Sequence, residues 1–205
     1  QFLLTRQQAD LVGDIVEKLD GHPLAIELVV AQTSYFEIAQ IHRRLTNRLL
    51  DAKSEIRSAP KRQQTLQATI DWTLDSLSTE EKELFESLCV FIGPFTYEAI
   101  EWLMDGECDN PFAHLVAKSL VVVYHGIQEQ QRYHIPEPIR ACSEAKHRIP
   151  EQILAKHASW FADWTHIAVQ NRGDTRVIAE SYANVRRAMD WLSNHDPQVL
   201  YQLVC

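Results

Sequence analysis

Leu120-Val121-Val122-Val123-Tyr124 is the stretch that decides the fold, because it interrupts a long series of helical patterns with β-branched and aromatic residues. His125-Gly126 follows as a turn, and Arg132-Tyr133-His134-Ile135 returns as a partner strand. The sequence therefore predicts one β-hairpin. Since helical segments precede it, we expect a winged helix, in which helices are followed by a hairpin.

Short helices are predicted directly before the hairpin, each with its own start signal. The first covers residues 66–77 and repeats leucine and isoleucine at helical spacing. Ser78 with Glu81 three residues later indicates a capping box that opens the second. Thr96 and Asn110 are suited to cap two further helices.

Helical patterns also fill both ends of the chain. Residues 5–19 predict an amphipathic helix with Thr5 as its cap. Gly21 ends that helix, and Pro23 suits the first position of a buried helix over 23–32. The remaining segments with helical patterns are 35–52, 138–146, 153–169, 178–192 and 199 onward, with a loop at 171–174. The fold class is therefore mainly α, and the five tryptophans are predicted to lie in its core.

Composition narrows the functional classes. The chain has 205 residues, 45% of them hydrophobic, and a formal net charge of −8. No apolar run is long enough to cross a bilayer, and no secretion signal begins the chain, so we expect a soluble, cytoplasmic protein without a membrane partner. The negative charge opposes non-specific attraction to nucleic acid. Charge is also segregated, because residues 71–109 hold eleven acidic residues against Lys82 alone.

Signatures of catalysis and metal binding are absent from the sequence. The four cysteines, Cys89, Cys108, Cys142 and Cys205, are widely spaced and lack zinc-ligand spacing, so reduced thiols and no metal site are expected. Neither a phosphate-binding loop nor a hydrolase motif occurs, so we do not expect this chain to be an enzyme by itself. The chain starts at Gln1 rather than methionine, and a piece of a longer protein is expected.

Several segments, in order, resemble one family. Gly21-His22-Pro23-Leu24 is similar to the Gly-x-Pro-Leu signature of the STAND class of signalling ATPases, which includes NB-ARC-like bacterial transcriptional regulators. Residues 77–91 and 115–121 resemble the entry and the helix-to-wing junction of the winged helix in such regulators. Residues 133–140 resemble the junction after the wing, and 182–192 resemble the segment that leads into their tetratricopeptide-like sensor.

The resemblance implies a domain organisation and a role. It implies a helical lid domain over 1–58, a winged-helix domain over 59–149, and a helical linker with the start of a sensor over 150–205. The parent would bind ADP and ATP through a phosphate-loop domain of the same chain, and nothing should bind tightly to this segment alone. Other implied partners are a ligand or protein at the sensor and further copies on activation.

The resemblance also implies nucleotide-facing residues. Pro23 would pack against the adenine of ADP, where its rigid ring presents apolar surface at low entropic cost. Gly21 and His134 would lie near the nucleotide too. The Met-His-Asp motif common at this wing junction is replaced by Ile135, Pro136 and Glu137, so His134 is the candidate stand-in for its phosphate-sensing histidine.

Alternative functions remain open at this point. The winged helix could read DNA, with residues 110–119 as the recognition helix. The helices could instead form a protein-interaction scaffold. Basic residues at 43–48 could dock on the acidic region 71–109 as a latch. Trp160, Phe161 and Trp164 could form an aromatic cage for a ligand.

Overall fold

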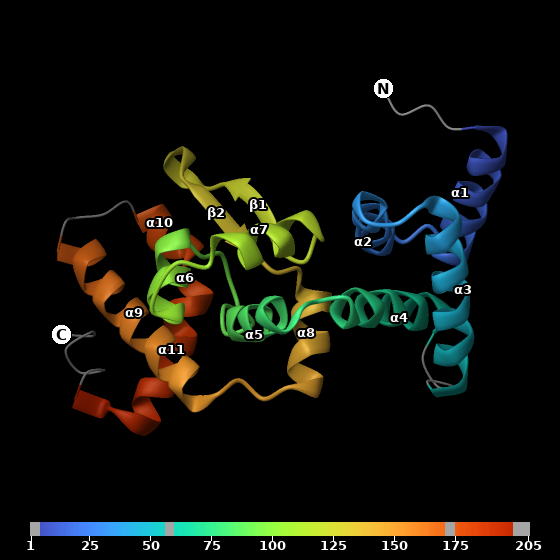
Figure 1. Ribbon diagram of the computed structural model, residues 1–205. Coiled ribbons are helices and arrows are strands. Elements are labelled where there is room, and N and C mark those ends of the chain that lie inside the picture. The colour runs from blue at the N-terminus through green and yellow to red at the C-terminus, as the bar shows by residue number, and fades with distance from the viewer. Residues whose placement is uncertain (1–4, 56–59, 171–174, 199–205) are drawn as a thin grey trace. The chain divides into compact units, whose positions relative to one another are not determined.

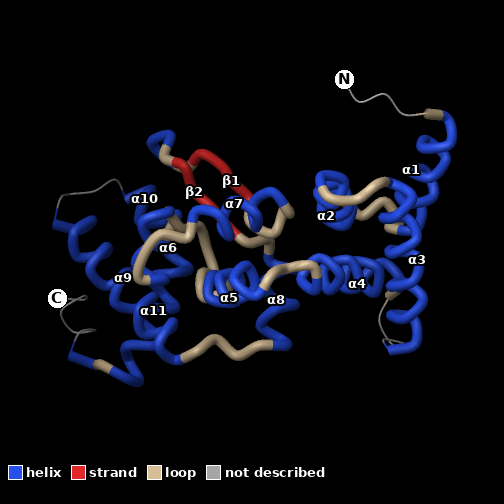
Figure 2. Tube along the Cα trace, in the orientation of Figure 1, coloured by secondary structure: helices blue, strands red, loops and turns tan. Residues whose placement is uncertain are grey.

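The computed structural model describes residues 5–55, 60–170 and 175–198, and these ranges are mainly α-helical (Figure 1). Their strands form a single two-stranded sheet (Figure 2). The chain divides into two compact units. The first unit comprises Gln1–Ser78 with Ala117–Ser119, and the second comprises Thr79–Val116 with Leu120–Cys205. The domain boundaries predicted at residues 58 and 149 remain predictions.

The first unit is built on helices that the sequence predicts. It consists of α1 (Arg6–Lys18), α2 (Pro23–Ala31), the 3-10 turn η1 (Gln32–Ser34), α3 (Ile38–Glu55) and α4 (Lys61–Asp75). Helices α1 and α3 pack together, and α4 contacts both α2 and α3. The core of this unit is made by Ile15, Leu19, Ala25, Val29, Ile41, Leu45 and Trp72.

Helix starts in the first unit follow local chemistry. The Thr5 hydroxyl accepts the Gln8 N–H at 3.3 Å, and the Gln8 side chain accepts the Thr5 N–H at 2.9 Å, which completes a capping box. Pro23 occupies the start of α2, as predicted. Helix α3 begins at Ile38 rather than residue 35, because η1 first continues α2 as a tighter turn.

The second unit contains the hairpin and the C-terminal helices. Its elements are α5 (Thr79–Leu88), α6 (Tyr97–Met104), α7 (Asp109–Ala117), β1 (Val122–His125), the 3-10 turn η2 (Ile127–Glu129), β2 (Gln131–His134), α8 (Glu137–Lys146), α9 (Glu151–Gln170), α10 (Thr175–Glu180) and α11 (Tyr182–His195). The Thr96 hydroxyl caps α6 by accepting the Ala99 N–H at 3.4 Å. Helices α9 and α11 lie side by side (Figure 1).

The hairpin pairs antiparallel, with Val122 opposite His134. Strand β1 starts at Val122, two residues later than predicted, because Ser119 adopts φ 57° and the Leu120 N–H bonds to the Leu115 carbonyl, which closes α7. Phe95 adds a bridge to the sheet, since Phe95 and Tyr133 exchange two backbone hydrogen bonds of 2.9 Å. Sequence reasoning missed this bridge.

Other expectations about the helices and the tryptophans are also wrong. Helix α7 begins at Asp109, so Asn110, predicted to cap it, lies inside the helix. The single helix predicted over 178–192 is two helices, because Ser181 leaves helical geometry at φ −91° and ψ 1° while its side chain is buried. Trp102 is 48% exposed and lies outside the core, whereas Trp72 is buried as predicted. The loop predicted at 171–174, the helix predicted from 199 onward and Cys205 lie outside the described residues.

Candidate functional site

The turn between α1 and α2 carries two of the predicted nucleotide-facing residues. Gly21 adopts φ 59°, in the left-handed region that glycine enters without steric cost, and its N–H bonds to the Val16 carbonyl at 3.1 Å. Asp20 also has a positive φ of 52°. This pair of left-handed residues reverses the chain and delivers Pro23 to the start of α2.

Pro23 is exposed at the start of α2, while Ala25, two residues on, is fully buried. Helix α2 therefore packs its apolar face into the core of the first unit, while the ring of Pro23 stays at the surface. Next to it, the half-buried His22 has an Nδ1 atom with no hydrogen-bond partner among the described residues. An exposed ring held on a rigid turn can offer a flat apolar contact to a ligand.

His134, the third predicted site residue, lies at the end of β2 in the second unit. Its half-buried ring meets the Tyr124 ring edge-on, with centroids 5.5 Å apart. Burial lowers the pKa of His134 below its usual value. Gly21 and Pro23 are thus close to each other, and His134 belongs to a different unit from them. Their role toward a nucleotide stays a prediction.

Asn184 of α11 is a residue that sequence reasoning missed, and it fixes the loop between α5 and α6. Its side-chain oxygen accepts the N–H groups of Ile92 (2.9 Å) and Gly93 (3.2 Å), and its side-chain nitrogen donates to the Pro94 carbonyl at 2.8 Å. Asn184 is fully buried. One buried side-chain amide therefore satisfies three backbone groups and joins α11 to the loop that precedes α6.

A second contact joins the hairpin to α10. Arg132 of β2 is only 3% exposed, and its Nε lies 4.0 Å from Oε2 of Glu180, the last residue of α10. The Tyr124 hydroxyl donates to the other Glu180 oxygen at 3.3 Å. Burial, with the neighbouring Glu180 charge, raises the pKa of Tyr124 to about 12. Neither Arg132 Nε nor Glu180 Oε2 has a hydrogen-bond partner among the described residues.

Gly126 allows the turn of the hairpin to approach Arg132 and Glu180 closely. A Cβ at Gly126 would lie 2.8 Å from Arg132 Cγ and 2.8 Å from Glu180 Oε1. Its own φ of −77° suits any residue, so space rather than backbone strain requires glycine here. The turn of the hairpin therefore packs directly against the Arg132–Glu180 ion pair.

His157 of α9 lies beside Asn184 and is 2% exposed. Its ring packs on Phe161 (centroids 4.8 Å apart) and Phe91 (5.4 Å). Burial, reinforced by the charge of Arg187 and opposed by a hydrogen bond with Asn184, lowers the pKa of His157 to about 3. The imidazole is neutral at physiological pH.

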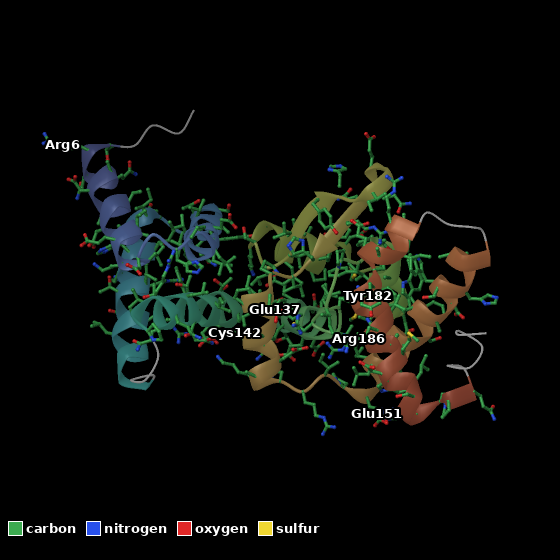
Figure 3. All side chains as sticks on the ribbon, turned by 180° about the vertical axis from the view of Figure 1, so that it is seen from behind. Arg6, Glu137, Cys142, Glu151, Tyr182 and Arg186 are labelled. Atoms are coloured by element: carbon green, nitrogen blue, oxygen red, sulfur yellow. The ribbon has the colours of Figure 1, made fainter. Side chains whose placement is uncertain are left out.

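Helices α8 and α11 are also linked, by charged side chains. Glu144 of α8 pairs with Arg140 at 2.6 Å and with Arg187 of α11 at 3.2 Å. Figure 3 labels Glu137 and Cys142 on α8 and Tyr182 and Arg186 on α11. Asn184, Arg132, His157 and Glu144 thus connect the hairpin, α8 and the C-terminal helices within the second unit.

The proposed DNA-reading face of α7 offers few free polar groups. His114 Nδ1 lies 2.9 Å from a carboxylate oxygen of Glu81. Lys118, just beyond the helix, is 7% exposed, and its ammonium lies 5.9 Å from the centre of the Tyr35 ring. Asp109 opens the helix with a negative charge. This composition is poorly matched to a phosphate backbone.

Among the described residues, no group of three or more His, Cys, Asp or Glu side chains could hold a metal ion. Across the same ranges, no helix combines the length and the apolarity that crossing a membrane requires. Arg48, in the basic stretch 43–48 predicted as a latch, pairs with Asp75 of the acidic region 71–109, and both residues belong to the first unit.

Relatives of the chain are found among mycobacterial proteins. A protein of Mycobacterium tuberculosis (strain ATCC 25618 / H37Rv), provisionally named an HTH-type transcriptional regulator, is 32% identical over 93% of this chain and 23% of its own length. An identically scoring protein of Mycobacterium bovis has the same kind of name. An uncharacterized protein of the same M. tuberculosis strain is 34% identical over 60% of this chain and 33% of its own length.

These matches cover only part of each relative. The chain spans about a quarter of the length of the named regulators and a third of the uncharacterized protein. No protein-family model and no solved structure matches the chain. The chain is therefore similar in sequence to one segment of much longer proteins, two of which are named as regulators of transcription.

Proposed function

We propose that the chain is the signal-coupling segment of a bacterial transcriptional regulator, joining a nucleotide-dependent switch to a sensor. The observation that carries the proposal is the compact second unit, in which Asn184 and the Arg132–Glu180 pair bind the C-terminal helices to the hairpin and to the loop before α6. A movement that starts in those helices must then displace the hairpin as well. The names of the long mycobacterial relatives support a role in regulation.

More specifically, we propose that the full-length parent protein belongs to the STAND class of signalling ATPases and that the first unit is its lid domain. The lid would close over ADP held by a phosphate-loop domain elsewhere in the parent, with the exposed Pro23 against the adenine and Gly21 shaping the turn beside it. His134 would sense the phosphates. A signal at the sensor would favour the ATP-bound, open arrangement, a population shift that can expose surfaces for oligomerisation.

The test uses the full-length protein. Pro23→Ala should make bound ADP dissociate about fivefold faster, because a contact made by a rigid ring is removed, worth about 1 kcal/mol. Release of a fluorescent ADP analogue in a stopped-flow experiment measures it. Pro138→Ala is the matched control, since Pro138 is also exposed in the first turn of a helix and should leave release unchanged.

The outcome separates the two forms of the proposal. A full-length protein without a phosphate-loop domain, or one that releases ADP equally fast with and without Pro23, would refute the lid. The absence of a phosphate-loop domain would refute the nucleotide-dependent switch as well. Unchanged ADP release would refute only the lid, and the contacts between the C-terminal helices and the hairpin would still support the coupling role.

A second candidate function, direct DNA reading by the winged helix, draws support from the HTH-type name of the relatives. The acidic start of α7 and the buried Lys118 oppose it. We therefore place the DNA-binding module of the parent outside this chain.

A further inference from the structure

A groove of about 750 Å³ lies within the second unit, between the hairpin and helix α9. Its walls come from the start of α6 (residues 96–98), from residues 130–133 at strand β2, and from Trp160 and Trp164 of α9. Ile167, Ala168 and Val177 extend the apolar side. The volume is in the range of pockets that hold small molecules. It touches none of the residues proposed to face the nucleotide.

Aromatic rings dominate the groove. Trp160 and Trp164 are half-buried on successive turns of α9, and the nearly buried Tyr133 lies across from them on β2. Tyr97 is held in place by a hydrogen bond from its hydroxyl to Asp109. Phe161, predicted from the sequence as part of an aromatic cage, is 3% exposed and packs against both Phe91 and Trp164, and it does not line the groove. The structure replaces it with the two tyrosines.

The lining of the groove carries one acidic side chain, Glu98, and one basic side chain, Arg132. Glu98 is exposed among the lining residues and raises the pKa of the neighbouring Tyr133 through its charge, second to burial. Glu98 makes no ion pair with any other described residue. The lining cation, Arg132, already faces Glu180 at 4.0 Å. One unpaired carboxylate therefore remains beside four aromatic rings.

We propose that this groove binds a small organic cation bearing a quaternary ammonium or guanidinium group. Aromatic faces attract such cations through their quadrupole, and aromatic cages are the usual recognition device for quaternary ammonium. Glu98 supplies the counter-charge at the edge of the groove. The proposal goes beyond the coupling role and does not depend on a nucleotide.

The location suggests what binding does. The groove is walled by β2 on one side and by α9 with Val177 of α10 on the other. The Arg132–Glu180 pair joins β2 to α10 beside it. A bound cation contacts both sides and stabilises their present arrangement. The groove is thus an effector site at the joint between the wing and the C-terminal helices.

Binding is tested on this chain with choline and with N-acetylarginine amide, by calorimetry and by quenching of tryptophan fluorescence. The neutral isostere of choline, 3,3-dimethylbutan-1-ol, is the ligand control. Saturable binding of at least one cation, about tenfold tighter than the isostere, is expected. If neither cation binds, or if the isostere binds as well as choline, the proposal is wrong.

Variants locate the site. Trp164→Leu should weaken cation binding about tenfold and Glu98→Gln about threefold, because each removes one attractive group. Trp191→Phe and Glu83→Gln are matched controls outside the groove and should bind normally. Circular dichroism checks that the variants fold. Normal binding by a folded Trp164→Leu variant would overturn the assignment to this groove, and Glu98→Gln gives an independent reading if that variant fails to fold.

Discussion

At the scale of single residues, His157 makes the stability of the protein depend on pH. Its pKa in the folded protein is about 3, against a usual value near 6.5, so the unfolded chain binds a proton between these values and the folded chain does not. Above about pH 6.5, His157 therefore does not reduce the free energy of unfolding, and below it that free energy falls as the pH drops toward 3. The expected slope from this residue is about 1.4 kcal/mol per pH unit.

Urea unfolding of the wild type and of His157→Gln at pH 7.5 and pH 5.0 measures this effect. The wild type should lose about 2 kcal/mol more than the variant on acidification, since glutamine does not titrate. Equal losses in both proteins would show that the folded protein protonates His157 without penalty.

Gly126 provides a second residue-scale prediction. Gly126→Ala should lower the free energy of unfolding by about 1–3 kcal/mol, because its Cβ would overlap Arg132 and Glu180. Gly13→Ala is the matched control. Gly13 lies inside α1 with open space around it, so alanine there should raise stability by about 0.5–1 kcal/mol. Opposite signs in thermal unfolding would support the close contact, and a neutral Gly126→Ala would contradict it.

The sequence predicts helix starts correctly where a residue interacts only with the backbone of its near neighbours. Thr5, Pro23 and Thr96 begin helices because their capping or ring chemistry needs only neighbours within three residues. Asn184 and His157 could not be found in this way, since their partners are far along the chain. A polar residue within an apolar helical pattern was the available signal.

At the scale of elements, Asn184 holds α11 to the loop before α6. Asn184→Ala leaves two N–H groups and one carbonyl without their partners, and should cost about 2–4 kcal/mol. Asn194→Ala removes an exposed hydrogen bond to the Asp190 carbonyl in the same helix and should change stability by less than about 0.5 kcal/mol. Chemical denaturation of both variants measures the difference. Similar small losses would mean that water replaces the Asn184 contacts.

The hairpin shows why element boundaries were harder to predict than element types. The β-branched run at 120–124 predicts a strand correctly, but buried Leu120 and Val121 belong to the turn that closes α7. The break at Ser181 likewise has no local signal such as Gly or Pro, and the side chain of Ser181 is buried. Periodicity identifies an element, and tertiary contacts decide where it ends.

At the scale of the whole molecule, the net charge distinguishes the proposed coupling role from direct DNA binding. With a net charge of −8, this chain should not retain a 30-base-pair duplex in a gel-shift titration at low salt, up to about 10 µM protein. An equally long duplex with a different sequence serves as the control for sequence preference. Tight retention of either duplex would favour the DNA-reading alternative and count against the coupling role.

The double hydrogen-bonding pattern of Asn184 has a consequence for the ageing of the protein. Its nitrogen donates to the Pro94 carbonyl while its oxygen accepts two N–H groups, so only an amide fits. Spontaneous hydrolysis of that amide would put a carboxylate oxygen opposite a carbonyl oxygen and bury an added negative charge. Deamidation at this single position would therefore loosen the joint, and the burial of Asn184 limits the access of water to its amide.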